Sequence, residues 1–249
     1  QKLMKNLFFT AVFSTGLLFT AQTEAREGHA LVRTVSGEAK MSVDGQNWKP
    51  LKVGAVLKTG TTVKTSTGGQ TDLFLGLNGS MLRIAGGSEL KFSRLMIADS
   101  PIEPIAQTEM ILKSGSAIGK VSKLPLGSSY VIKTPKGEAK VKGTVYEINA
   151  DGELIVVSGK VEYTDASNGK EVLIAGGEKY SGGRELKAAA DEQAAAAAAS
   201  AAFSTPGFNI KVPLRQGVFK TEAIAPAEWY NPIAIDNLKA VPVSPVEGN

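Results

Sequence analysis

Residues 128–164, SSYVIKTPKGEAKVKGTVYEINADGELIVVSGKVEYT, decide the fold class of this chain. Short runs rich in β-branched and aromatic residues alternate there with breaks at Pro135 to Gly137, Gly143, Asp151-Gly152 and Ser158-Gly159. An Asp-Gly pair between alternating apolar runs is a strong signal for a turn between strands, because glycine accepts positive φ without steric cost. The stretch therefore predicts strands rather than a helix, at residues 130–134, 138–141, 144–149, 153–157 and 160–164.

The same strand-and-turn pattern fills the region upstream. It predicts strands at 30–35, 38–43, 61–65, 70–75, 80–85 and 88–95, and the two prolines within 99–104 predict a loop. Glycines that precede many of these strands recur at intervals of roughly 20 residues with one double step, from Gly79 to Gly115, and a period near 20 is typical of solenoids. They are Gly37, Gly60, Gly79, Gly115, Gly137, Gly159 and Gly177. We expect an all-β fold, a β-solenoid or β-helix-like roll of short strands, with a two-sheet β-sandwich as the alternative.

Composition removes several classes of function. The chain has no cysteine, which excludes disulfides, a cysteine nucleophile and thiolate metal sites, and its one histidine, His29, is not part of a recognisable triad. The net charge is only +4, with lysines scattered among acids, so nucleic-acid binding is not expected. We expect a protein that is not an enzyme and uses no metal or other cofactor.

The N-terminal residues have the features of an export signal. Lys2 and Lys5 precede an apolar run at 7–21, and small residues follow at 23–25. We expect residues 1–25 to be a secretory signal peptide, with the mature chain beginning near Arg26 in the periplasm or outside the cell. The alternative, an uncleaved membrane anchor, would need a longer apolar run of about 20 residues.

The composition changes after the strand-rich region. We expect a β domain at 26–184, an alanine-rich helix that acts as a spacer at 185–203, and an extended, proline-containing tail at 204–249. Alanine favours the helix, but such a helix has few large apolar side chains to bury.

Several motifs in the predicted β domain resemble FecR-like domains, the periplasmic part of iron-citrate-type sensors, which also occur as free-standing envelope domains. Those motifs lie at 48–54, 57–65, 77–84, 112–115, 134–135, 141–148 and 157–161, and the resemblance spans about 30–180. The resemblance implies an exported, non-enzymatic domain that acts through protein or envelope contacts, in a role such as envelope signalling.

The partner implied is an unknown envelope protein or polysaccharide, and the oligomeric state stays open. We expect no cytoplasmic sigma-factor-binding segment before the predicted signal, and therefore no direct sigma-factor binding. A secreted carbohydrate-binding or carbohydrate-cleaving protein is the alternative function.

The resemblance also marks one bond in this chain. Some membrane sensors of the family cut themselves at a Gly-Thr pair, and Gly143-Thr144 is the matching pair, where the Thr144 hydroxyl would attack the Gly143 carbonyl. A bulge or close strand crossing at Gly143 would explain the same residues without cleavage.

The remaining candidates for chemistry are weaker. Asp165, Ser167, Asn168 and Glu171 around Gly169 faintly resemble a calcium loop, although Asx-Gly clusters are usually plain turns. Glu147, Asp151, Glu153 and Glu162 occupy solvated positions without an evident acid and base pair. Trp48, Tyr130, Tyr146, Tyr163 and Tyr180 could stack on sugars, but aromatic residues at alternating strand positions are usually core.

Overall fold

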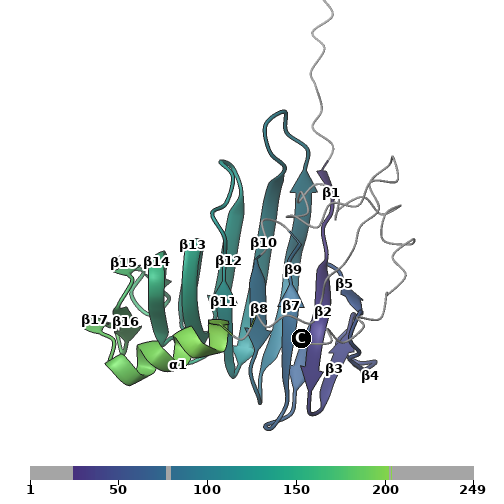
Figure 1. Cartoon of the computed structure of the whole chain (residues 1–249), viewed down its shortest axis with the longest axis horizontal. Helices are drawn as coiled ribbons and strands as arrows, with labels where there is room; N and C mark the ends of the chain where they lie inside the picture. The colour runs from purple at the N-terminus through teal and green to yellow at the C-terminus, as the bar shows by residue number, and fades with distance from the viewer. Residues whose placement is uncertain (1–24, 77–79, 202, 204–249) are drawn as a thin grey trace, which may run out of the picture.

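The computed structural model describes residues 25–76, 80–201 and 203, and it is built almost wholly of β-strands (Figure 1). The predicted signal peptide, except for its last residue, and the predicted tail lie outside the described residues. The all-β prediction is confirmed. Within the described part no helix is long and apolar enough to cross a bilayer.

The strands pair in two rows, which we call the first row and the second row. In order of pairing, the first row contains β4 (Lys49–Pro50), β3 (Ala39–Ser42), β6 (Thr62–Thr65), β9 (Glu89–Ala98), β10 (Ile105–Ser114) and β12 (Ser129–Thr134). The second row contains β5 (Val56–Leu57), β2 (Ala30–Ser36), β7 (Gln70–Phe74), β8 (Met81–Ile84) and β11 (Ser116–Lys120). The short β1 (Ala25–Glu27) pairs with the end of β9.

Two long strands belong to both rows. The first half of β13 (Gly137–Asn149) pairs with β12, and its second half pairs with β11. Its hairpin partner β14 (Leu154–Asp165) likewise pairs with β15 (Glu171–Ala175) in the first row and with β16 (Glu178–Ser181) in the second, and β16 continues to β17 (Arg184–Lys187). The hairpin therefore joins the two rows, as strands that switch between packed sheets do.

The core lies between the two rows. Leu73 and Leu82 of the second row belong to the same buried cluster as Phe92 and Met110 of the first. Strands alternate inward apolar and outward polar residues, so each row buries one face and leaves the other exposed. In the described residues no pairing joins β5 to β3 or β4, so the sheet curls without closing at that side.

A solenoid is not confirmed. Successive coils of a solenoid stack parallel strands at a fixed repeat, whereas among the described strands only β10 and β12 pair in parallel. Two rows around one core are nearer to the alternative expectation of two packed sheets. In the roughly 20-residue series Gly79 lies outside the described residues, Gly37, Gly60, Gly115 and Gly177 lie in turns or bends, and Gly137 and Gly159 lie in β13 and β14. Their spacing therefore does not mark equivalent positions.

Helix α1 (Ala190–Ala201) packs on the outer face of the second row. Glu192 near its start binds Lys179 of β16 (2.6 Å), Ala196 at its middle is fully buried, and the carbonyl of Ala199 near its end accepts from Arg83 of β8 (3.2 Å). The Glu192 side chain also accepts from the backbone N–H of Ala189, which caps the first turn. The predicted helix is present, and it is packed against the sheet instead of standing apart as a spacer.

Candidate functional site

The predicted self-cleavage pair lies where the long hairpin bends from one row to the other. Lys142 of β13 faces Lys160 of β14 in register, and the next aligned pair is Val145 with Ser158. Gly143 (φ 64°) and Gly159 (φ 86°) occupy the gap, both in the left-handed region. The sequence predicted strand breaks here; instead the strands continue through a β-bulge, which sharpens the local bend.

The two strands approach closely at this bend. A methyl group added to Gly159 would lie 2.5 Å from the Gly143 carbonyl oxygen and 2.9 Å from the Thr144 Cα. A methyl on Gly143 would meet nothing nearer than the Lys123 Cα at 3.5 Å. Glycine is thus favoured at position 159 both because φ is positive and because a side chain has no room there. At position 143 glycine is favoured by the positive φ alone.

Thr144 is buried and repairs the hydrogen bonding that the bulge disrupts. Its hydroxyl donates to the carbonyl of Lys160 (2.8 Å) and accepts from the Lys160 N–H (3.3 Å). Its own carbonyl accepts from the N–H of Val121 (2.9 Å). The alternative interpretation of Gly143, a bulge at a close strand crossing, is confirmed as geometry. Self-cleavage at Gly143-Thr144 stays a prediction.

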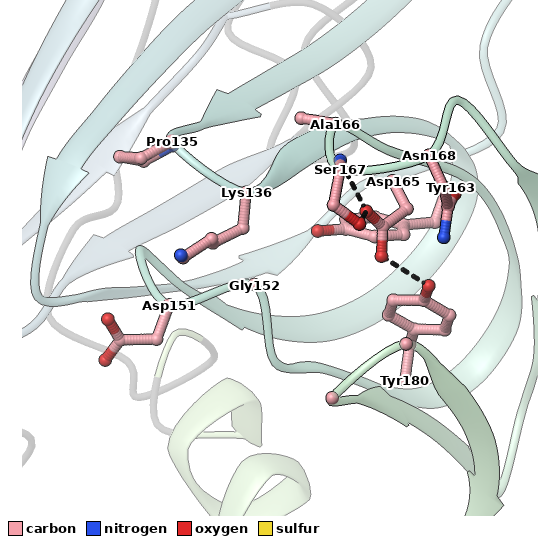
Figure 2. A pocket seen from close by; sticks show the side chains of 12 residues that line it. Pro135, Lys136, Asp151, Gly152, Tyr163, Asp165, Ala166, Ser167, Asn168 and Tyr180 are labelled. Carbon is pink, nitrogen blue, oxygen red and sulfur yellow. Dashed lines mark hydrogen bonds between the residues drawn. The ribbon is translucent and has the colours of Figure 1, made fainter.

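A pocket of about 720 Å³ lies away from the bend, where the turn of the β13–β14 hairpin and its open end come together. Turns that are distant in the sequence meet there: Lys136 between β12 and β13, Asp151 between β13 and β14, Asn168 after β14, and Gly182 between β16 and β17 (Figure 2). A methyl on Gly152 would lie 2.6 Å from the Lys136 Cβ, which shows how closely the doubled hairpin brings these turns together.

Asp165 is the centre of the polar contacts in this pocket (Figure 2). One carboxylate oxygen accepts from the backbone N–H (2.7 Å) and hydroxyl (2.5 Å) of Ser167, and the other accepts from the Tyr180 hydroxyl (2.6 Å). The bonds from Ser167 and then from Tyr180 lower the pKa of Asp165. Burial, with the neighbouring Asp165 charge, raises the pKa of Tyr180 to about 12.

These contacts make the predicted calcium-like loop a turn. Both carboxylate oxygens of Asp165 are occupied by hydrogen-bond donors, and the Asn168 side-chain oxygen accepts from the N–H of Lys170 (2.8 Å). Glu171 lies on β15, exposed. No group of three or more acidic or histidine side chains in the described residues is arranged to hold a metal ion. The Asx-turn interpretation accounts for the bonds from the backbone N–H groups of Ser167 and Lys170.

The tyrosines proposed for sugar stacking are core residues. Tyr130, Tyr146, Tyr163 and Tyr180 are each at most 3% exposed. Tyr146 donates to the Tyr130 hydroxyl (3.0 Å), and burial raises the pKa of both. Trp48 is partly exposed, with the Lys64 ammonium 4.4 Å from its ring centroid. Tyr163 and Tyr180 line the pocket but are only 1% and 2% exposed, so the four rings are mainly part of the core.

The candidate carboxylates do not gather in one place. Asp151 lies in the pocket and Glu162 faces Lys140 across the hairpin, whereas Glu147 lies between Ile118 and Ile155 on the outer face of the second row. Burial, and then the nearby charge of Glu153, raise the pKa of Glu147. A raised pKa is one property expected of a general acid, and Glu147 has it. The alternation of acidic with apolar residues in the sequence predicted a solvated side chain and did not indicate this shift.

A buried ion pair was also missed by the sequence interpretation. Arg83 of β8 donates through two nitrogens to both carboxylate oxygens of Asp72 on β7 (2.6 and 2.8 Å). Both side chains are largely buried, and Arg83 also reaches the carbonyl of Ala199 in α1. The sequence places Asp72 and Arg83 at outward strand positions, where polar side chains usually face water. The pair is buried because α1 packs over it, and the sequence pattern of the strands does not show this.

Comparisons with known proteins place part of this architecture in a family. A family model described as "FecR protein" matches residues 61–162, and none of the curated proteins compared with the chain matches it. Two crystal structures titled as a "putative anti-sigma factor" from Parabacteroides distasonis are similar at 19% identity. One has a TM-score of 0.41 and aligns 55% of this chain with 64% of its own; the other has a TM-score of 0.39 and aligns 53% with 61%.

The chain thus spans less than two thirds of either structure. The matched segment runs from β6 into β14 and contains the bulge at Gly143 and Gly159. Residues 61–162 of this chain are therefore a FecR domain.

Proposed function

We propose that this protein is an exported, non-enzymatic FecR-domain protein that acts by contact with another protein of the cell envelope, in envelope signalling. The observation that supports it most directly is the outer edge of β15. In the described residues β15 forms a strand ladder with β14 alone, and its Leu173 is 52% exposed. Open strand edges with apolar side chains are sites where a partner segment adds to a sheet.

The contacts of the candidate chemical groups support a non-enzymatic role. The Thr144 hydroxyl and the Asp165 carboxylate are engaged in structural hydrogen bonds, and the four tyrosines are in the core. Thr144, Tyr130 and Tyr146 are buried away from the pocket, and Asp165, which lines it, has both carboxylate oxygens occupied by hydrogen-bond donors.

The proposed location is the periplasm or the exterior, after removal of residues 1–25. The support is the sequence of that segment: two lysines, an apolar run too short to span a bilayer easily, and small residues before Arg26. Intact-mass analysis of the protein recovered from periplasmic and membrane fractions tests this. A chain that keeps residues 7–21 and stays with the membrane would refute the proposed location.

Site-specific photocrosslinking in cells tests the contact. A photoreactive residue at Leu173 should give a discrete protein adduct. Val53 is an apt control because it is also 52% exposed but lies in a loop outside the strands. Equal adducts from both positions, or none from Leu173, would argue against partner binding at this edge.

The polar pocket supports a second candidate function, binding or cleavage of an envelope polysaccharide. Its turns expose backbone groups and the side chains of Lys136, Asp151 and Asn168 (Figure 2). A screen of the purified protein against envelope and capsular glycans, with turnover measured in parallel, tests it. Binding that survives changes at Leu173 but not at Lys136 would favour this candidate.

A further inference from the structure

One end of the molecule exposes two large aliphatic side chains on neighbouring loops. Ile102, between β9 and β10, is 91% exposed, and Leu126, between β11 and β12, is 99% exposed. The loops lie side by side, because Ser128 accepts from the N–H of Ala106 (3.0 Å) and a methyl on Gly127 would lie 3.4 Å from Ile105. Aliphatic side chains this exposed at loop tips add nothing to the core.

Three lysines lie at the same end. Lys123 belongs to the Leu126 loop, and its Cα is 3.5 Å from where a methyl on Gly143 would be. Beside that bend Lys142 of β13 and Lys160 of β14 face each other across the hairpin, and both side chains are exposed. Like charges directly opposite each other on a ladder are destabilising. In the described residues neither of these two ammonium groups has an ion pair or hydrogen bond.

The acidic groups nearby do not pair with Lys142 or Lys160 in the described residues. Asp99 is paired with Arg26 (3.1 Å), and Glu162 lies directly opposite Lys140. Glu103, on the Ile102 loop, is the remaining carboxylate there. The surface that we call the loop end, made of Ile102, Lys123, Leu126, Lys142 and Lys160, is therefore apolar at its tip and basic at its base.

The start of the described chain is at this end too. Ala25 in β1 pairs with Ala98, the last residue of β9 before the Ile102 loop, and Figure 1 shows β1 and the β9–β10 loop at the same end of the molecule. The apolar run at 7–21 precedes Ala25 by only a few residues. The loop end is therefore the end of the described domain at which the chain leaves toward the predicted export signal.

From this arrangement we infer that the loop end docks on the surface of an anionic lipid bilayer, with Ile102 and Leu126 entering the headgroup region and the lysines meeting lipid phosphates. Apolar tips combined with basic side chains are the chemistry that binds such surfaces. The inference deepens the proposed envelope role and rests on the proposed export, which brings the domain to a membrane surface.

Vesicle binding tests the surface independently of export. Residues 26–249, produced without the N-terminal run, are mixed with vesicles of phosphatidylcholine alone or with phosphatidylglycerol, and bound protein is measured by flotation at low and high salt. We expect binding to the anionic vesicles, weakened by salt because exposed charges are screened.

Two variants separate the apolar and the basic contributions. Lys142→Gln with Lys160→Gln should weaken binding to anionic vesicles about 25-fold, since each lysine near such a surface contributes a factor of about five. Ile102→Ser with Leu126→Ser should weaken binding about tenfold or more. Thermal unfolding should be unchanged in both, because these side chains are exposed.

Matched controls remove the same residue types elsewhere. Val43→Ser with Val53→Ser takes away two exposed aliphatic side chains, and Lys49→Gln with Lys52→Gln takes away two exposed lysines. Both should bind like the parent protein. Absence of binding to anionic vesicles, or equal losses in the controls, overturns the inference; cytoplasmic retention with intact vesicle binding would instead refute only the proposed location.

Discussion

Replacing Gly159 with alanine tests the bend that joins the two rows. The new methyl would lie 2.5 Å from the Gly143 carbonyl oxygen and 2.8 Å from the Thr144 hydroxyl oxygen, so backbone must move. The φ of 86° adds a second cost, because a side chain in the left-handed region loses about 1–2 kcal/mol. Overpacking of this kind costs about 1–3 kcal/mol. We expect Gly159→Ala to lower the free energy of unfolding by about 3 kcal/mol.

Two other glycines supply controls with the same backbone conformation and more space. Gly169 has a φ of 69° and nothing within 4 Å of an added methyl, and Gly143 has a φ of 64° with its nearest neighbour at 3.5 Å. Alanine at either position should cost only the backbone term, about 1–2 kcal/mol. The difference between Gly159 and these positions isolates the close crossing of the strands.

Thermal and urea unfolding measure the effect. For a chain of this size 1 kcal/mol corresponds to about 2–4 °C, so Gly159→Ala should melt about 6–12 °C below the parent protein. The two controls should melt about 2–8 °C below it, and at any one conversion factor less far below it than Gly159→Ala. The urea midpoint should fall in the same order without a change in slope. If Gly159→Ala melts with the controls, the strands do not cross as described and the reasoning fails.

Three further predictions address the cleavage pair, the pocket and the helix. If the chain cuts itself at Gly143-Thr144, denaturing electrophoresis after long incubation shows two fragments that Thr144→Ala abolishes; a single full-length band in both means that the pair is only structural. Tyr180→Phe should destabilise the fold more at pH 7 than near pH 3, because the lowered pKa of Asp165 adds stability above its ordinary value near 4 that is lost as the pH falls through the folded value. Tyr130→Phe is its control, since the Tyr130–Tyr146 bond joins neutral hydroxyls and its loss should not vary over this range; equal pH profiles would refute the assignment. A chain ending at Arg184, the predicted boundary, should fold but melt below one ending at Phe203, because it lacks residues 185–187 of β17 as well as α1 and its bond to Lys179; equal melting temperatures would show that neither element adds stability.

Local structure could be predicted from the sequence where neighbouring residues alone determine the backbone conformation. Asp151-Gly152 predicted the hairpin turn, and the structure closes it with the Asn149 N–H donating to the Glu153 carbonyl (3.0 Å). Alternation of tyrosines with polar residues correctly favoured the core over ligand stacking. The alanine-rich run predicted a helix because its propensity is local.

What could not be predicted depends on residues that are distant in the chain. Gly143 and Gly159 were read as strand breaks because positive φ serves a turn and a bulge equally well. Only the register of β13 against β14 distinguishes them. The docking of α1 likewise depends on Lys179 and Arg83, which belong to different strands and come together only when the second row has formed.

The bent hairpin also explains why the pocket and the loop end are separate. Each half of β13 is about six residues long, which at roughly 3.3 Å per residue spans about 20 Å. The bend brings the turns at Lys136 and Gly152 together at one end and leaves Lys142 and Lys160 at the other. A ligand in the pocket therefore cannot touch a membrane bound at the loop end. Changes at Lys142 and Lys160 should leave glycan binding at the pocket intact, and changes at Lys136 should leave vesicle binding intact.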